Sequence, residues 1–122
     1  MQWALVFVFG GLGAVTRVGV AHFFPVRALP WGTLLVNVAG CLAIGALYHF
    51  FESRPPLVGP WRVALIGGFL GGFTTFSTFS NETLNFLRGG EQLLAAINIG
   101  AQLIGGLGAV WLGRALAYVI WR

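Results

Sequence analysis

The chain has 122 residues, of which 57% are hydrophobic and only 8% carry a charge. Its mean hydropathy of +0.85 and its low charge lie far outside the range of soluble domains, in which roughly a quarter of the residues are charged. These values exclude a water-soluble globular domain. The seven basic residues, all Arg, are spread thinly along the chain, whereas a nucleic-acid surface requires clustered positive charge. We therefore expect no nucleic-acid partner.

Four apolar stretches are each long enough to cross a hydrocarbon layer of about 30 Å, which takes about 20 helical residues. We expect transmembrane helices at about residues 2–24, 31–51, 63–87 and 92–121, and one domain over residues 1–122. Segments rich in Pro and Gly separate the stretches and predict short turns at the membrane surface. A cleavable signal peptide is not expected, because the first stretch lacks a basic lead-in.

The chain has few residues that could form disulfides or bind transition metals. Cys41 is the single cysteine, and His22 and His49 fall on different apolar stretches. This pattern excludes an internal disulfide framework and has no zinc-type ligand spacing. No nucleophile and base stand within plausible reach of each other, so we do not expect an enzyme.

The arginines give almost no orientation signal. Four spans would place Arg54, Arg62, Arg114 and Arg122 on one side and Arg17, Arg27 and Arg88 on the other. Membrane proteins normally orient by an excess of Lys and Arg in cytoplasmic loops. Either the chain inserts in both orientations, or a few positions decide the orientation of a small protein.

The fourth stretch carries small residues on one helix face, at Ala101, Gly105, Ala109 and Gly113. Such a stripe lets another helix approach closely. The partner helix could belong to the same subunit or to a second copy. Oligomerisation would be the simpler way to enclose a pathway, because four helices leave little room for one.

The third stretch predicts a broken helix. Four Gly fall within residues 67–72, and a run of hydroxyl residues follows them. We expect a break near residues 71–75. A break at mid-membrane depth is tolerated only where the freed backbone is buried in protein or lines a cavity. The exposed carbonyls of such a break can hold hard cations.

The remaining polar residues of the spans predict an ion pathway. Asn37 stands alone in the second stretch, while Asn98 and Gln102 are four residues apart in the fourth. A single Asn in a membrane helix is more often a helix-to-helix hydrogen bond, but three carboxamides without a carboxylate favour a conduit. Phe76 and Phe79 share a helix face, and the positive edges of aromatic rings can contact an anion. Core packing or lipid contact remains the ordinary role of a Phe pair.

Three blocks of sequence resemble the Fluc family of fluoride channels, also called CrcB. They are GGLGAVTR at residues 10–17, WGTLLVN at 31–37 with Gly40, and GFLGGFTTFSTF at 68–79. The resemblance covers essentially the whole chain. It implies an all-α membrane protein that forms an antiparallel, dual-topology homodimer. It further implies two fluoride pores at the dimer interface and passive export of fluoride across the inner (plasma) membrane, which relieves fluoride toxicity.

The same resemblance implies roles for individual residues. A structural sodium ion would be held by the backbone carbonyls of Gly71 and Thr74 from both copies. The matching pathway residues are Asn37, Phe76, Phe79, Ser77 and Thr78, with Glu82 at the pore end and Arg17 in a vestibule or at the interface. The fourth span departs from the family pattern, because Asn98 and Gln102 stand where some members carry Tyr and Ser. Both can still donate hydrogen bonds along the pathway.

Two other functions are compatible with four short spans. A small dual-topology multidrug efflux transporter would use a membrane-embedded Glu to couple protons to cationic substrates, yet no acid precedes Glu52 in the first two spans. A purely structural membrane subunit would carry no ion at all. A flux measurement separates these alternatives from a channel.

Overall fold

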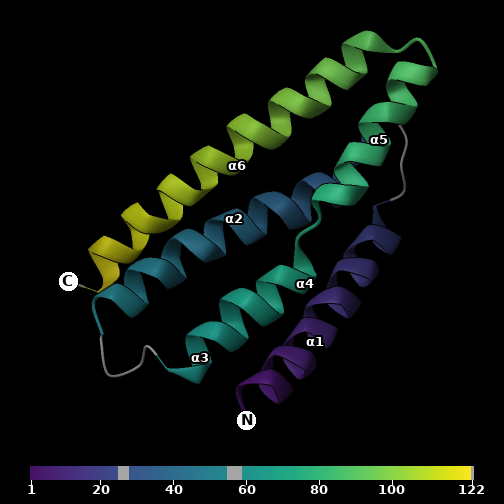
Figure 1. The fold of residues 1–122 in the computed structure, drawn as a ribbon. Coiled ribbons are helices and arrows are strands. Elements are labelled where there is room, and N and C mark those ends of the chain that lie inside the picture. The colour runs from purple at the N-terminus through teal and green to yellow at the C-terminus, as the bar shows by residue number, and fades with distance from the viewer. Residues whose placement is uncertain (25–27, 55–58, 122) are drawn as a thin grey trace.

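The computed structural model describes residues 1–24, 28–54 and 59–121, and every regular element in these ranges is helical. The elements run in the order α1 (Gln2–Phe23), α2 (Trp31–Glu52), α3 (Pro60–Arg62), the π-helical stretch η2 (Val63–Leu70), α4 (Gly71–Phe73), α5 (Phe76–Arg88) and α6 (Gln92–Ile120) (Figure 1). Arg27 and Arg122 of the charge comparison, and the turn prolines Pro25, Pro55 and Pro56, lie outside the described residues.

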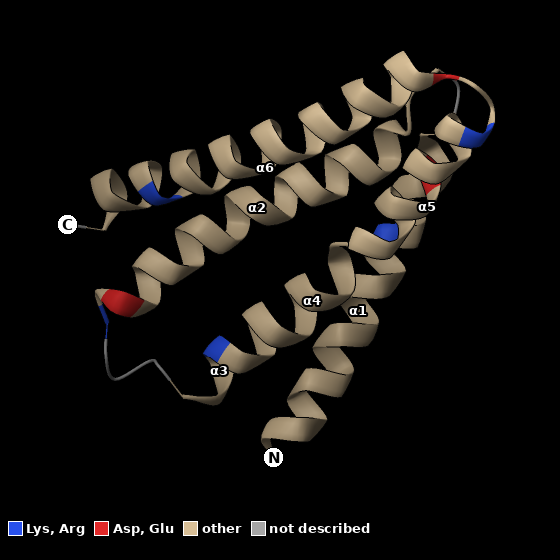
Figure 2. Cartoon of the chain, turned by 45° about the horizontal axis from the view of Figure 1, so that its top comes forward, with Lys and Arg blue, Asp and Glu red and all other residues tan. Residues whose placement is uncertain are grey.

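Four helical segments are long and apolar enough to cross a membrane, as the sequence predicts. They are α1 and α2 with 22 residues each, the combined segment Pro60–Arg88 with 29, and α6 with 29. Large apolar side chains cover the outside: Phe7 is 82% exposed and Leu107 is 74% exposed. Such a surface suits hydrocarbon rather than water. The few charged residues lie mostly near the ends of the helices (Figure 2).

Helices α2 and α6 pack closely because glycines allow their backbones to meet. A Cβ atom at Gly45 would overlap the carbonyl of Val110, and one at Gly113 would overlap the carbonyl of Leu42. Ala109 is also buried. The C-terminal half of the small-residue stripe on α6 therefore packs within one subunit. Its other half, at Ala101 and Gly105, lines an open apolar groove between α2 and α6, where a Cβ atom at Gly105 would lie 3.3 Å from the side chain of Val38.

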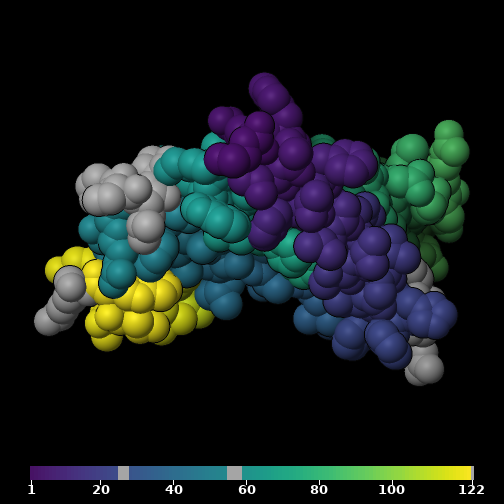
Figure 3. All heavy atoms as spheres, turned by 90° about the horizontal axis from the view of Figure 1, so that it is seen from below, coloured from purple at the N-terminus to yellow at the C-terminus, as the bar shows by residue number. Residues whose placement is uncertain are grey.

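The combined segment Pro60–Arg88 is called the third segment below. Helix α1 packs in the same way against the half of this segment that precedes the break. A Cβ at Gly13 would overlap the carbonyl of Phe69, and one at Gly72 would overlap the carbonyl of Gly10. The molecule thus consists of two close helix pairs. In Figure 3, α1 (purple) and the C-terminal part of α6 (yellow) lie apart, with α2 and the third segment between them.

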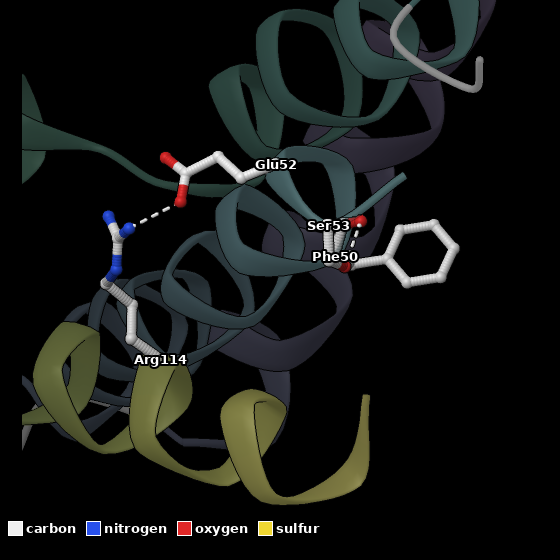
Figure 4. A network of polar contacts seen from close by, with 4 residues as sticks. All are labelled: Phe50, Glu52, Ser53 and Arg114. Carbon is white, nitrogen blue, oxygen red and sulfur yellow. Dashed lines mark hydrogen bonds and ion pairs between the residues drawn. The ribbon is translucent and has the colours of Figure 1, made fainter. Parts of the chain in front are cut away.

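Local interactions end the helices. The α5–α6 connection is a glycine turn in which the N–H of Glu91 donates to the carbonyl of Phe86 at 2.8 Å. Gly90 has φ +76° there, a conformation that favours glycine. At the other end, a half-exposed ion pair of 2.6 Å joins Arg114 of α6 to Glu52 of α2 (Figure 4). An exposed pair of this kind contributes about 0–1 kcal/mol to stability.

The third segment is interrupted at Thr74 and Thr75, within the predicted range. Thr74 has φ −85° and ψ 157°, and Thr75 has φ −150° and ψ 113°, so both are extended. The glycines before them stay helical. The glycine run therefore serves close packing against α1, and the chain leaves helical geometry only at the first hydroxyl residues that follow it.

Candidate functional site

The interruption is held by the side chain of Asn37 on α2. Its Oδ1 accepts a hydrogen bond from the N–H of Thr75 at 2.8 Å, and its Nδ2 donates to the carbonyl of Thr75 at 3.0 Å. Nδ2 also donates to Oε1 of Gln102 on α6 at 3.0 Å. Extended backbone inside a membrane must find partners outside its own helix. One carboxamide therefore satisfies Thr75 and joins three segments at the break.

The break withdraws the usual amide donors from two carbonyls. In a continuous helix, the N–H of Thr75 would point at the carbonyl of Gly71, and that of Thr78 at the carbonyl of Thr74. Here Thr75 donates to Asn37, and Thr78 donates to Oγ1 of Thr75 at 3.2 Å. Gly71 and Thr74 are the two predicted sodium ligands. Both residues line the hollow beside the break.

Arg17 of α1 faces inward and caps the first half of the broken segment. Its Nε donates to the carbonyl of Gly72 at 3.1 Å. Next to it, Oγ1 of Thr74 donates to the carbonyl of Leu70 at 2.9 Å. These donors satisfy carbonyls at the C-terminal end of a helix, where the helix dipole also favours a positive charge. Arg17 therefore contributes both a hydrogen bond and a cation close to the break.

A hollow of about 340 Å³ lies beside the break. Its walls are mainly apolar, and its polar groups come from the break and from the two carboxamides that meet there. The residues that line it include Asn37, Thr74, Thr75, Phe76, Phe79 and Gln102. The side chain of Phe76 is 75% exposed, so a single chain leaves part of this lining uncovered.

Phe76 and Phe79 lie on one face of the first turn of α5. Their ring centroids are 5.5 Å apart and their planes meet at 61°. Phe79 is buried at 9% exposure, in contrast to Phe76. Ring edges carry the positive part of the aromatic quadrupole. The hollow can therefore offer an anion ring edges without a formal positive charge among the residues that line it.

The hydroxyl residues form a cap at the start of α5. Oγ1 of Thr75 donates to Oγ1 of Thr78 at 2.9 Å and lies 3.3 Å from Oγ of Ser77. A Thr in this position satisfies amide groups that the first turn of a helix leaves free. Ser77 and Thr78, both predicted pathway residues, therefore belong to one polar cluster, which lies next to the two Phe rings.

The two carboxamides of α6 have different surroundings, although they are four residues apart. Asn98 is buried, and its Nδ2 donates to Oγ1 of Thr83 on α5 at 3.0 Å. It does not line the hollow. Gln102 lines the hollow and accepts from Asn37. The structure therefore brings Gln102 together with Asn37 and the Phe pair, while Asn98 joins α6 to α5.

Glu82 lies one turn beyond Phe79 along α5. Its Oε1 accepts a hydrogen bond of 2.6 Å from Oγ1 of Thr33 on α2. Its Oε2 is buried and has no hydrogen-bond partner among the residues that the structure describes. A buried carboxylate oxygen without a partner is unusual in a native protein. Glu82 therefore forms a second polar position beyond the rings.

Sequence reasoning assigned no role to Thr33, Thr75 or Thr83. Thr75 could have been found from its place before the hydroxyl-rich start of a helix, which is typical of an N-cap residue. No spacing rule identifies Thr33 or Thr83, because each pairs with a residue on another segment. Only the packing of α5 against α2 and α6 makes them partners.

Comparison with known proteins places this chain in a family. Residues 4–114 match the family described as CrcB-like protein, Camphor Resistance (CrcB). The fluoride-specific ion channel FluC of Nitratidesulfovibrio vulgaris is 44% identical over 107 residues, which cover 85% of this chain and 86% of the relative. That of Geotalea daltonii is 44% identical over 117 residues, covering 93% and 94%. That of Pyrococcus abyssi is 42% identical over 114 residues, covering 93% of each chain.

The matches extend over nearly the whole chain and include all three sequence blocks that carried the resemblance. The relatives are named as ion channels rather than enzymes, so the prediction that this chain is not an enzyme is confirmed. A multi-pass membrane protein agrees with the four apolar helices. The chain belongs to the CrcB-like family.

Proposed function

We propose that this protein is a fluoride channel that lets fluoride leave the cell passively. The observation that carries the proposal is the meeting of two Phe rings and two carboxamides at a helix break. It occurs in a chain whose relatives are named fluoride-specific ion channels. Export across the inner (plasma) membrane would lower the fluoride concentration inside the cell.

The chemistry of the hollow suits a small, strongly hydrated anion. Fluoride gives up its water only where several donors replace it at once, and ring edges and amide hydrogens are such donors. The proposed pathway passes Phe76 and Phe79 and continues along Ser77 and Thr78 toward Glu82. Neutral donors bind an anion weakly enough to release it, which conduction requires.

The functional unit in this proposal is an antiparallel homodimer with two pores. A single chain leaves Phe76 largely exposed at the hollow. A second copy would cover this side and complete each pathway. The small residues at Ala101 and Gly105, which line an open apolar groove, would offer further surface for close helix contact.

A structural sodium ion at the centre of the dimer would suit the oxygen ligands that this chain can supply. The described part of the chain has no group of three or more His, Cys, Asp or Glu that could hold a metal. The carbonyls of Gly71 and Thr74, whose helical donors are diverted, would supply oxygen ligands from each copy. Carbonyls of unwound membrane helices hold sodium in this way. The bound cation would lower the electrostatic cost of a nearby anion.

A fluoride electrode tests the proposal directly. Purified protein in liposomes loaded with fluoride should release it without a proton gradient. Phe76→Ile should reduce the release rate at least about tenfold, because the ring edge is lost from the pathway. Phe7→Ile is the matched control, since Phe7 is also highly exposed but lies on α1; it should release fluoride like the wild type.

Three results would contradict the proposal. Liposomes containing the wild-type protein could retain their fluoride, which would favour a structural subunit. Release could require a proton gradient and extend to aromatic cations, which would favour the multidrug transporter. Equal fluoride release by Phe76→Ile and Phe7→Ile would remove the Phe pair from the pathway.

A further inference from the structure

Two arginines keep hydrogen-bond donors that the described part of the chain does not use. Arg17 donates to a backbone carbonyl near the helix break, and Arg114 pairs with Glu52. Arg54 and Arg62 instead lie over aromatic rings, and neither has a hydrogen bond or an ion pair with a described residue. A ring covers the face of a guanidinium and leaves the N–H groups at its edges accessible. Both groups can therefore bind an anion.

The rings that hold these arginines belong to the last turns of α2. Cζ of Arg62 lies 5.0 Å from the ring centroid of Tyr48, and Cζ of Arg54 lies 5.2 Å from that of Phe50. The ring of Phe50 meets that of Trp121 at 5.1 Å, at the end of α6. The arginines are thus placed by rings on packed helices. A side chain that is already placed loses less freedom when it binds a ligand.

Both arginines lie at one end of the membrane helices. Arg54 follows the end of α2, and Arg62 is the last residue of α3, where the third segment begins. Figure 2 shows these two helix ends on the same side of the molecule. Because α2 and the third segment are long enough to span a membrane, their ends meet the headgroup layer, which arginine side chains near helix ends reach. The accessible N–H groups therefore lie at the level of lipid phosphates.

This end also has more positive charge than its acid can balance. Its described charged groups are one acid and three bases, namely Glu52, Arg54, Arg62 and Arg114. Glu52 is paired with Arg114. By contrast, the α5–α6 turn at the opposite end has one charge of each sign, on Arg88 and Glu91. Only the first end therefore complements an anionic headgroup.

We propose that this end of the protein binds anionic phospholipids, whose phosphate groups accept hydrogen bonds from Arg54 and Arg62, and that Tyr48 positions Arg62. The edge of a guanidinium matches two phosphate oxygens at once. This inference does not rest on the proposed transport of fluoride. In the proposed antiparallel dimer, one such end would face each leaflet of the membrane.

Native mass spectrometry of the purified protein in detergent tests the proposal by counting bound lipids. The wild type should bind phosphatidylglycerol more tightly than phosphatidylcholine, whose headgroup has no net charge. Arg54→Gln and Arg62→Gln should each weaken phosphatidylglycerol binding about fivefold, the effect of one arginine near an anionic leaflet. The double variant should lose the preference for phosphatidylglycerol. Arg88→Gln is the matched control, because it removes the same charge from the exposed end of α5 and should bind like the wild type.

A second pair of variants tests the positioning role without changing any charge. Tyr48→Leu removes the ring below Arg62 and should weaken phosphatidylglycerol binding about two- to fivefold, the usual effect of one cation–π contact. Phe7→Leu removes a ring that is 82% exposed on α1 and should leave binding unchanged. Thermal unfolding in phosphatidylcholine should be similar for both variants and the wild type, which shows that they are folded.

Each contrary result overturns a stated part of the proposal. Equal binding of the two lipids by the wild type would remove the anionic lipid as the ligand. Equal weakening by Arg88→Gln and Arg62→Gln would mean that net charge acts without a site. Displacement of the lipid by potassium phosphate, beyond that by potassium chloride at the same ionic strength, would indicate a site for soluble phosphate. Wild-type binding by Tyr48→Leu would overturn the role of the ring.

Discussion

At the scale of single residues, Asn37 explains how a membrane protein keeps an interrupted helix. Extended backbone exposes an N–H and a carbonyl that lipid cannot satisfy. Asn37 satisfies both groups of Thr75 from a neighbouring helix. The sequence offered two roles for this residue, a helix-to-helix bond and a pore donor. The structure contains the helix-to-helix bond, and it lies at the wall of the hollow.

Replacing Asn37 should therefore lower stability as well as flux. Asn37→Ala leaves the N–H and carbonyl of Thr75 without partners, and we expect the free energy of unfolding to fall by about 2–4 kcal/mol. Denaturation of the purified protein in detergent, followed by circular dichroism, measures the change. Asn81→Ala is the control, because Asn81 is exposed on α5. Equal stability of the two variants would contradict the clamping role.

At the scale of secondary structure, the third segment shows that the break lies directly after the glycine run, inside the predicted range of residues 71–75. The glycines at 67–72 predicted weak helix near residues 71–75. They remain in η2 and α4, and the extended residues are Thr74 and Thr75. Close approach of α1 stabilises the glycine half, since Gly72 leaves no room for a Cβ atom next to Gly10. Asn37 then stabilises the extended pair.

Helix α6 allows a matched test of glycine packing. A Cβ atom at Gly113 would overlap the carbonyl of Leu42, whereas Gly108 has open space around it. Gly113→Ala should lower the free energy of unfolding by about 1–3 kcal/mol, the usual effect of overpacking. Gly108→Ala should leave it unchanged or raise it by up to about 1 kcal/mol, because Ala favours helix over Gly.

The same unfolding assay compares the two variants of α6. Similar destabilisation by both substitutions would mean that glycine matters there through backbone flexibility or contacts with another copy. Destabilisation of Gly113→Ala alone would support backbone contact between α2 and α6 as the cause.

At the scale of the whole molecule, the even spread of Arg bears on how the chain enters the membrane. Arg62 is the last residue of α3, Arg114 pairs with Glu52 at the end of α2, and Arg88 is the last residue of α5. Helix α3 and the α5–α6 turn lie at opposite ends of the molecule (Figure 1). Orientation follows an imbalance of positive charge between the two sides. Little imbalance exists among the described arginines, and the proposed antiparallel dimer requires insertion in both orientations.

Cysteine labelling in cells tests this orientation. In a Cys41→Ser background, Glu91→Cys and Gln2→Cys place a thiol at opposite ends of the helices. If both orientations coexist, as the proposed dimer requires, a membrane-impermeant maleimide should label about half of each population from outside. A single orientation would instead label one variant fully and the other not at all. That outcome would exclude the antiparallel dimer.

Composition and apolar run length determined much of this protein without any structure. Four stretches too apolar for water specify four membrane helices, because the thickness of the bilayer sets the length of each span. Short motifs were sufficient to identify the family, and they placed the break within five residues. These are local properties, so they can be read from neighbouring positions in the chain.

The tertiary structure decided which polar atoms meet. Asn37, Thr75 and Gln102 are far apart in the chain, and they form one hydrogen-bonded set only because α2 lies between the third segment and α6. Asn98 and Gln102 looked equivalent on one helix face, yet one bonds to Thr83 on α5 and the other reaches the hollow. Hydrogen bonds depend on distances of about 3 Å and on donor direction. The packing of the helices sets both the distances and the directions, and the spacing of residues along a single helix does not determine either.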